Sequence, residues 1–178
     1  MTFYQGTNGR VAVLLPGRGY SPNHPLLYYA RSVVLEQGWS VEEVNWSAKD
    51  LASHESLTDT IKSTLDKVAD KNPLVIGKSL GSFALPLVAP LGWPAIWLTP
   101  LLNLPELVDA LRNVKGKTLL VGGTADDVWD SKVAMATGLQ VLEIPGADHG
   151  LEIPGDPVAS AKVLTEFVAT MTLFVEGL

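Results

Sequence analysis

Residues Gly77 to Gly81 read Gly-Lys-Ser-Leu-Gly, so that Ser79 has a glycine two positions away on either side. An apolar run, 73–76, precedes this segment, and a helix-forming run, 83–85, follows it. A serine in this setting is expected on a sharp turn between a strand and a helix, where only small neighbours avoid collision with both elements. The turn would expose the hydroxyl, and the helix N-terminus would favour negative charge that develops beside it. The pattern predicts that Ser79 is a nucleophile, with a serine that caps an ordinary turn as the alternative.

Two phosphate-binding patterns overlap or resemble parts of this sequence, and neither is complete. A P-loop requires a glycine five positions before Gly77, but Asn72 stands there and the residues between them form the predicted strand. The segment Gly17 to Pro22 begins like a dinucleotide-binding fingerprint, yet Pro22 occupies the position of the third glycine. No nucleotide or other cofactor is therefore expected.

A serine nucleophile needs a base, and the base needs a carboxylate that orients it. The chain has three histidines, His24, His54 and His149, and only His149 follows Ser79. It lies just after the last predicted strand, in a loop that would leave the carboxyl edge of a parallel sheet, where open α/β folds bind ligands. His149 is the predicted general base, with a loop histidine bonded to backbone as the alternative.

The orienting carboxylate is expected in the loop that follows the preceding strand. That loop contains Asp126, which is preferred as the acid, and Asp127, which is the alternative. The aspartate that does not orient His149 is expected to cap the following turn. Glu152 would serve only if the base loop folded back, and Asp148 is too close to His149 in sequence to reach its ring easily.

Two backbone N–H groups must stabilise the oxyanion of a tetrahedral intermediate. The first is expected from Leu80, directly after the nucleophile, and the second from the loop after the first strand, 16–20. Arg18 is preferred as the second donor over Gly17 and Gly19, whose lack of a side chain lets the backbone approach the reacting atoms. The Arg18 side chain is expected either to bind a substrate carboxylate or to stay solvated.

Several residues near predicted strand ends are candidates for contact with the substrate. They are Gly17, His24, Leu101 and Trp129. Tryptophan is as often a packing residue, so Trp97 and Trp129 are candidates for either role, and His24 is alternatively a surface residue at a helix start. Lys78 is expected to pair with a nearby carboxylate rather than to modulate the charge of the site.

Composition argues against several classes of protein. The chain of 178 residues is 47% hydrophobic and 18% charged, which provides enough apolar material for a substantial core. A formal net charge of −6 and the lack of a basic cluster argue against nucleic-acid binding. There is no cysteine, and His149 and Glu152 lack a second histidine at metal-ligand spacing, so no metal site is expected. The expected partner is a small acyl substrate.

Neither a secretion signal nor a membrane span is expected. The first residues contain no basic segment followed by an apolar core, so no signal peptide is evident and a cytoplasmic location is expected. The segment 79–105 contains no charged residue, but five prolines interrupt it. It therefore predicts a buried helix, a turn and a buried strand instead of a bilayer-spanning helix. The sequence does not specify the oligomeric state.

Short apolar segments alternate with helical segments along the chain. The predicted strands are 11–15, 41–45, 74–76, 95–98, 118–121 and 141–144. The predicted helices are 25–37, 57–70, 80–89, 104–112, 131–137 and 157–173. This alternation indicates one domain, 1–178, with a doubly wound, mainly parallel α/β sheet of about six strands and helices on both faces. Two glutamates place 41–45 at an edge of the sheet, and residues 2–5 are too few to assign as a further edge strand.

Taken together, these segments resemble the α/β-hydrolase superfamily, and more narrowly its small, lidless, dienelactone-hydrolase-like bacterial members. The resemblance rests on 16–19, 77–81, the glycine–aspartate spacing of 123–126 and 148–150, with 149–156 typical of the subgroup. It implies a minimal fold without a cap, a sheet in local order 2-1-3-4-5-6, and acyl transfer to water through an acyl-Ser79 intermediate. Two features depart from the family: Pro16 replaces its usual histidine, and its first hairpin is shortened or missing.

The predicted function is hydrolysis of small carboxylic esters or thioesters. The segment between the strands 95–98 and 118–121 has room for one helix only, so the resemblance implies an exposed site with little enclosed volume. A small serine peptidase would use the same three residues and is an alternative. A non-catalytic scaffold of this fold that binds a ligand or partner is the alternative from another class, although a scaffold needs none of the three residues.

Overall fold

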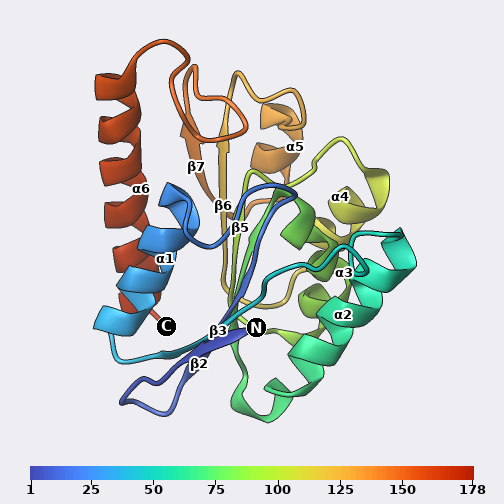
Figure 1. The fold of residues 1–178 in the computed structure, drawn as a ribbon. Helices are drawn as coiled ribbons and strands as arrows, with labels where there is room; N and C mark the ends of the chain where they lie inside the picture. The colour runs from blue at the N-terminus through green and yellow to red at the C-terminus, as the bar shows by residue number, and fades with distance from the viewer.

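Seven strands form one sheet in the computed structural model, which describes residues 1–178 (Figure 1). Their order is β1-β3-β2-β4-β5-β6-β7, and every neighbouring pair is parallel except β1 and β3. The strands are β1 (Thr2–Tyr4), β2 (Val11–Leu15), β3 (Ser40–Glu43), β4 (Leu74–Lys78), β5 (Ala95–Leu98), β6 (Thr118–Gly123) and β7 (Gln140–Ile144). The six predicted strands thus lie in the order 2-1-3-4-5-6, with their carboxyl ends at one edge of the sheet.

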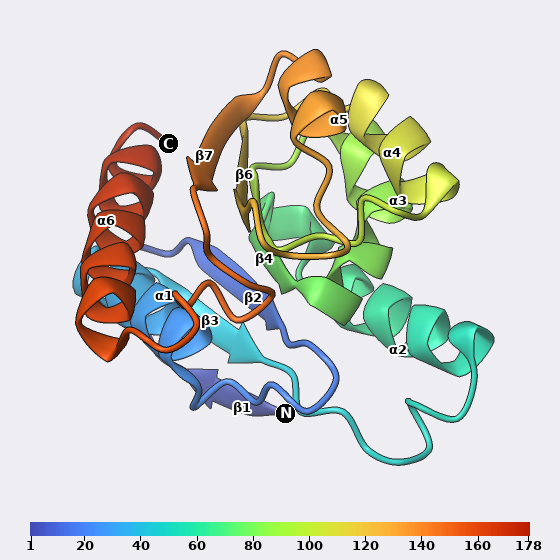
Figure 2. The same ribbon diagram turned by 90° about the horizontal axis from the view of Figure 1, so that it is seen from above.

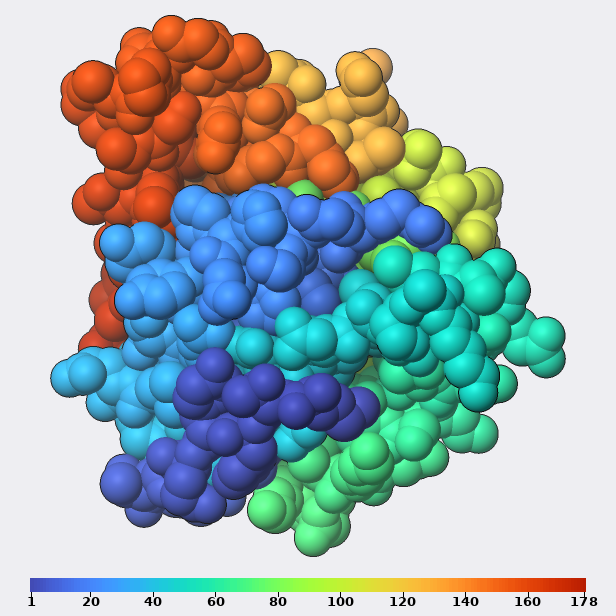
Figure 3. All heavy atoms as spheres, viewed as in Figure 1, coloured from blue at the N-terminus to red at the C-terminus, as the bar shows by residue number.

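The N-terminal strand β1 forms the edge of the sheet next to β3. It pairs with β3 in antiparallel register, with Phe3 opposite Glu42. Figure 3 shows the first residues of the chain, in dark blue, on the surface beside the light-blue and cyan region that contains β3. The prediction that 41–45 is an edge strand is therefore wrong. Glu43 tolerates burial because it forms an ion pair with Arg31, which also lies 5.0 Å from the ring centroid of Tyr4.

Two helices cover one face of the sheet and four cover the other (Figures 1 and 2). The first face carries α1 (Pro25–Glu36) and α6 (Pro157–Glu176). The other face carries α2 (His54–Asp66), α3 (Leu85–Val88), α4 (Pro105–Arg112) and α5 (Ser131–Ala136). This is the doubly wound arrangement that the alternation of strands and helices predicts.

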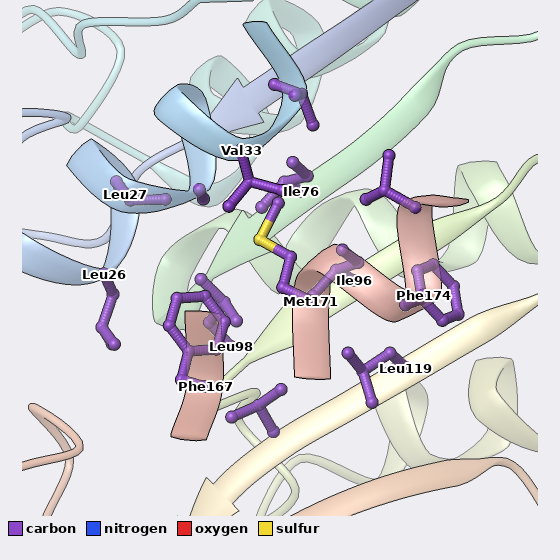
Figure 4. Close-up of a cluster of buried hydrophobic side chains, with 14 of the residues drawn as sticks. Leu26, Leu27, Val33, Ile76, Ile96, Leu98, Leu119, Phe167, Met171 and Phe174 are labelled. Carbon is purple, nitrogen blue, oxygen red and sulfur yellow. The ribbon is translucent and has the colours of Figure 1, made fainter. Parts of the chain in front are cut away.

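The inner strands send alternate side chains into two apolar cores, one under each helical layer. In β2, Ala12 and Leu14 face α1 and α6, whereas Val11 and Val13 face the other layer. Figure 4 shows the first core, in which side chains of α6 pack against those of β4, β5 and β6. The labelled residues of α6 are Phe167, Met171 and Phe174, and those of the strands are Ile76, Ile96, Leu98 and Leu119. Burial on both faces explains why these strands lack a polar alternation.

The segment after Ser79 forms three short helical pieces instead of the single predicted helix 80–89. A 3-10 helix, η2 (Ser79–Ala84), leads into α3, and a second 3-10 helix, η3 (Ala89–Leu91), follows it. Pro86 lies in α3 and Pro90 in η3. Because proline has no N–H group, neither residue can donate the hydrogen bond that a continuous α-helix would require.

The helix α2 starts and ends earlier than the predicted segment 57–70. It begins at His54 because Ser53 caps it, accepting a hydrogen bond from the Ser56 N–H. The residues after it form a separate 3-10 turn, η1 (Ala69–Lys71), which ends at Asn72 in the left-handed conformation. The apolar stripe predicted for this helix is present, since Leu57, Ile61 and Leu65 are buried.

The helix α6 is the one helix whose length and apolar composition would allow it to cross a membrane. In this fold it packs along the sheet, with Val163, Phe167 and Met171 buried in the core. Core helices satisfy the same criteria of length and composition, and this packing accounts for the apolar side chains that α6 buries. The segment 79–105, which lacks charge, folds into short elements, η2, α3, η3 and β5.

Candidate active site

Ser79 follows the last residue of β4 and begins η2, at the carboxyl edge of the sheet. Its backbone is left-handed, with a φ of 50°, a conformation that is costly for a residue with a side chain and is typical of functional turns. The turn leaves no room for side chains on either side. A Cβ on Gly77 would lie 2.6 Å from Cζ3 of Trp97, and a Cβ on Gly81 would collide with the backbone oxygen of Leu15. Packing therefore requires glycine at both positions.

Ser79, His149 and Asp126 form a hydrogen-bonded chain. Ser79 Oγ lies 2.8 Å from Nε2 of His149, and Nδ1 of His149 lies 2.8 Å from Oδ2 of Asp126. An ionised carboxylate only accepts hydrogen bonds, so Nδ1 carries the proton and Nε2 is free to accept from the serine hydroxyl. The Asp126 side chain is 1% exposed, whereas that of His149 is 42% exposed. The Asp126 carboxylate is thus shielded, while the His149 imidazole is open to solvent.

The acid loop, which follows β6, positions Asp126 with a further hydrogen bond. Oδ1 of Asp126 accepts the Val128 N–H at 3.1 Å, so one carboxylate both contacts His149 and caps its own turn. The expectation that the other aspartate caps this turn is therefore wrong. Asp127 is exposed and forms no hydrogen bond to His149.

The base loop, which follows β7, is held by its own hydrogen bonds. Oδ1 of Asp148 accepts the N–H groups of Gly150 at 2.8 Å and of Glu152 at 3.1 Å. The Asp148 N–H donates to the Glu152 carbonyl at 2.9 Å, and the Ala125 N–H donates to the Ala147 carbonyl at 2.9 Å, which joins the acid loop to the base loop. Asp148 and Glu152 therefore shape the loop and do not orient the imidazole.

The oxyanion loop, 16–20, places unpaired backbone donors beside the nucleophile. Gly17 is buried, and a Cβ placed on it would lie 3.3 Å from Cβ of Ser79. The N–H groups of Arg18 and Gly19 have no hydrogen-bond acceptor within the chain. The N–H of Leu80 lies in the first turn of η2, where a helix offers no acceptor of its own. This arrangement can supply the two donors that an oxyanion requires, and the choice of Arg18 over Gly19 stays a prediction.

Lys78, the residue before the nucleophile, is buried, with 2% of its surface exposed. Its ammonium donates to the His149 carbonyl at 2.7 Å and lies 4.9 Å from the ring centroid of Tyr20. The predicted pairing with a carboxylate is wrong, because no acidic oxygen lies within ion-pair distance of Nζ. Burial lowers the pKa of Lys78 to about 8, and the negative charges of Asp126 and Asp148 oppose this shift.

Tyr20 connects the oxyanion loop to α1, a role that sequence reasoning missed. Its Oη accepts the Leu26 N–H at 3.1 Å, and its ring stacks on that of His24 with 4.7 Å between centroids. Burial raises the pKa of Tyr20 to about 12; the hydrogen bond from Leu26 opposes this shift and the charge of Glu152 adds to it. The phenol therefore stays neutral and fixes the end of the loop. The available signal was an aromatic residue directly after Gly-Arg-Gly.

The other candidates for substrate contact divide between the surface and the core. His24 is exposed at the start of α1, and Leu101 is half-buried in the apolar cluster under α2 to α5. Trp97 is fully buried, and Trp129 is 8% exposed with its indole N–H donating to Glu143 at 2.7 Å. The position of both tryptophans favours the packing alternative.

The surroundings of the site contain two cavities and no metal-binding cluster. One cavity, of about 270 Å³, is lined by Glu152 and by residues of α1 and α6. The other, of about 250 Å³, is lined by Gly17 and Trp46, whose indole N–H donates to the Pro16 carbonyl at 2.8 Å. Neither lining includes Ser79 or His149, so neither cavity encloses the reacting atoms. No three His, Cys, Asp or Glu side chains are grouped so that they could hold a metal ion.

Known structures share the arrangement of these elements. No family model matches the sequence, and no curated protein is significantly similar to it in sequence. Est1E from Butyrivibrio proteoclasticus is similar with a TM-score of 0.75 and 12% identity, over 98% of this chain and 93% of that one. A lidless α/β serine hydrolase from Xanthomonas campestris has a TM-score of 0.67 and 16% identity, over 97% and 83% of the two chains. The chain has the lidless α/β-hydrolase fold.

A lipase of the same fold shows how widely the similarity extends. The monoacylglycerol lipase of Paleococcus ferrophilus has a TM-score of 0.71 and 15% identity, over 97% of this chain and 98% of its own. At such low identities the similarity concerns the fold, and function has to be argued from the residues of the site.

Proposed function

We propose that the protein is a serine hydrolase that cleaves small carboxylic esters or thioesters. The observation that carries this proposal is the pair of 2.8 Å hydrogen bonds that join Ser79 Oγ to His149 and His149 to Asp126. Such a chain activates a serine hydroxyl as a nucleophile. The unpaired N–H groups of the oxyanion loop support the proposal, because acyl transfer needs donors aimed at a developing negative charge.

The proposed reaction has two halves that use the same residues. In the first half, Ser79 Oγ attacks the carbonyl carbon while His149 Nε2 takes the hydroxyl proton, and the N–H groups of Leu80 and Arg18 stabilise the oxyanion. The bond to the leaving group then breaks, the leaving group takes the proton from His149, and acyl-Ser79 remains. In the second half, His149 activates water, which releases the carboxylic acid. Asp126 keeps the imidazole in the correct tautomer throughout.

The open surroundings of the site support a small substrate. The chain between β5 and β6 contains α4 as its one helix, and no cap covers the carboxyl edge of the sheet. Ferulic acid binds to the similar Est1E, which supports an acyl group of modest size for this chain.

Hydrolysis of p-nitrophenyl acetate, butyrate and decanoate by the wild type and by Ser79→Ala tests the proposal. The wild type is expected to hydrolyse the two short esters faster than the decanoate. Ser79→Ala is expected to lose at least about 10³-fold in kcat, because the nucleophile is removed. Ser63→Ala, an exposed serine of α2, is the matched control and should keep the wild-type rate.

Each other outcome points to a different conclusion. Activity that survives in Ser79→Ala contradicts the assignment of the nucleophile, and rates that climb with acyl length contradict the small substrate. A wild type that cleaves none of these esters but still reacts with a fluorophosphonate at Ser79 would indicate a peptidase or a narrow thioesterase. A wild type that shows neither reaction would favour the non-catalytic scaffold.

A further inference from the structure

Lys78 is a buried cation that serves as neither nucleophile nor base in the proposed reaction. Its side chain is among the largest that are almost fully buried, and removal of an ammonium group from water is costly unless other groups compensate its charge. No ion pair provides that compensation. A methionine would fill a similar volume without this cost, so the charge itself needs an explanation.

The contacts of Lys78 link three segments of the site. Its ammonium donates to the His149 carbonyl of the base loop at 2.7 Å and lies 4.9 Å from the Tyr20 ring of the oxyanion loop. Its stem packs against Gly17, where an added Cβ would lie 3.2 Å from Lys78 Cδ. Figure 3 shows the blue segment after β2 beside the orange segment after β7 on the surface. Since Lys78 ends β4, one side chain ties both loops to the turn that carries Ser79.

We propose that the Lys78 ammonium is a positioning group of the active site, which holds the base loop and the oxyanion loop in place around Ser79. Through the His149 carbonyl it fixes the residue whose Nε2 lies 2.8 Å from Ser79 Oγ. Through the Tyr20 ring it supports the loop that carries the unpaired N–H donors. This inference rests on the proposed function, because it concerns the activation of Ser79 by His149.

The hold that Lys78 exerts depends on its charge, and its charge depends on pH. Burial lowers its pKa to about 8. The groups that face it are Tyr20 from the oxyanion loop, Asp126 from the acid loop, and Asp148 and His149 from the base loop. Of these, Tyr20 has a pKa of about 12 and stays neutral in this range. A neutral amine is a weaker donor to a carbonyl and makes no cation–π contact, so both loops should loosen above about pH 8.

Labelling of Ser79 by an alkyl fluorophosphonate tests this role without knowledge of the natural substrate. In this reaction Ser79 Oγ displaces fluoride from phosphorus, and His149 takes the hydroxyl proton. The second-order rate is measured from about pH 6 to about pH 10 for the wild type, Lys78→Met and Lys78→Arg. Ser79→Ala is the blank, and Lys62→Met, an exposed lysine of α2, is the matched control. Thermal unfolding checks that each variant is folded.

The wild-type rate is expected to fall above about pH 8, where the Lys78 ammonium loses its proton. Lys78→Met is expected to react about 10- to 100-fold more slowly at neutral pH, because small displacements of catalytic groups slow a reaction by such factors. Its rate is not expected to fall at alkaline pH. Lys78→Arg keeps its charge at alkaline pH and is expected to react faster there than Lys78→Met.

Two results would overturn the role of Lys78. One is a Lys78→Met rate within about twofold of the wild type. The other is a reduced rate with an unchanged pH profile, which a packing defect alone would produce. If Lys78→Met does not fold, a wild-type rate that stays level above about pH 8 overturns the proposal. A wild type that is not labelled at any pH refutes the proposed function instead, so the two failures are distinguishable.

Discussion

The acid and base loops differ from the oxyanion loop in how their backbone groups are satisfied. Asp148 accepts two N–H groups of the base loop, and Asp126 accepts one from its own turn. In the oxyanion loop, the N–H groups of Arg18 and Gly19 have no acceptor, and both residues are exposed. The first two loops therefore fix side chains in place, whereas the third offers donors to a group that arrives from outside.

This difference leads to different tolerances of substitution. The acid and base loops depend on particular side-chain atoms, so a substitution that removes one of those atoms should greatly lower the reaction rate. The oxyanion loop depends on its backbone, so substitution of an exposed side chain such as Arg18 should change the reaction rate only slightly. Lys78 lies between the two regions and touches both of them.

Asp126→Asn is expected to have the largest effect of the substitutions that test this comparison. The asparagine amide would donate to Nδ1 and place the imidazole proton on Nε2, where it prevents acceptance from the Ser79 hydroxyl. Steady-state kinetics with p-nitrophenyl acetate should show kcat lower by about 10³- to 10⁴-fold and KM little changed. Asp127→Asn, next to it and exposed, is the control. A similar loss in the control would contradict the choice of Asp126 as the acid.

Lys78→Met is expected to raise the free energy of unfolding at neutral pH even though it slows the reaction. Lys78 has a pKa of about 8 in the folded protein and the ordinary value of 10.5 in the unfolded chain. Below about pH 8 both states hold the proton, and its burial destabilises the fold by about 3 kcal/mol. Between about pH 8 and 10.5 the unfolded state binds more protons, so the wild type gains stability with pH and the advantage of Lys78→Met shrinks.

Denaturant unfolding of the wild type and Lys78→Met at several pH values measures this difference directly. Other groups titrate in the same range, but they cancel when the two proteins are compared at each pH. Lys62→Met should show no such pH-dependent difference, because Lys62 is exposed. A Lys78→Met variant that is less stable than the wild type at every pH would show that the buried ammonium stabilises the fold.

Arg18→Ala is expected to have the smallest effect, because it leaves the backbone N–H in place. The rate with p-nitrophenyl acetate should change by no more than about twofold. An ester that carries a carboxylate sharpens the test, since loss of a guanidinium that binds this group would raise KM for the charged ester alone. A rate with the neutral ester that is lower by about 100-fold would show instead that the Arg18 side chain takes part in the reaction.

The inner strands and the elbow could be predicted because their physical requirements lie within a few neighbouring residues, whereas the order of the strands was implied by the resemblance to the α/β-hydrolase superfamily. Ser79 needs small residues at 77 and 81, and glycine at both positions avoids the collisions that a larger residue would create. Apolar runs without polar alternation indicated strands covered on both faces, and each of them lies inside the sheet. Ser79, Asp126 and His149 each follow a predicted parallel strand, and the carboxyl ends of parallel strands lie at the same edge of the sheet.

The features that were not predicted depend on pairs of residues far apart in the sequence. Glu43 of β3 is buried by virtue of Arg31 on α1, and this pair allows β3 to lie inside the sheet. Lys78 donates to the carbonyl of His149, 71 residues later. Every residue has a backbone carbonyl, so residue types do not indicate which carbonyl accepts this hydrogen bond. Such pairings follow from the three-dimensional fold and not from local spacing.

Trp129 lies three residues after Asp126, and its indole N–H is bonded to Glu143 of β7. Indole fluorescence responds to the polarity and hydrogen bonding of the ring, so this residue can serve as an optical reporter of order in the acid loop. The chain has five tryptophans, and replacement of the other four by phenylalanine would isolate its signal. Emission from such a variant would follow the acid loop during turnover with no added dye, and would show whether that loop keeps its hydrogen-bonded arrangement when a substrate binds.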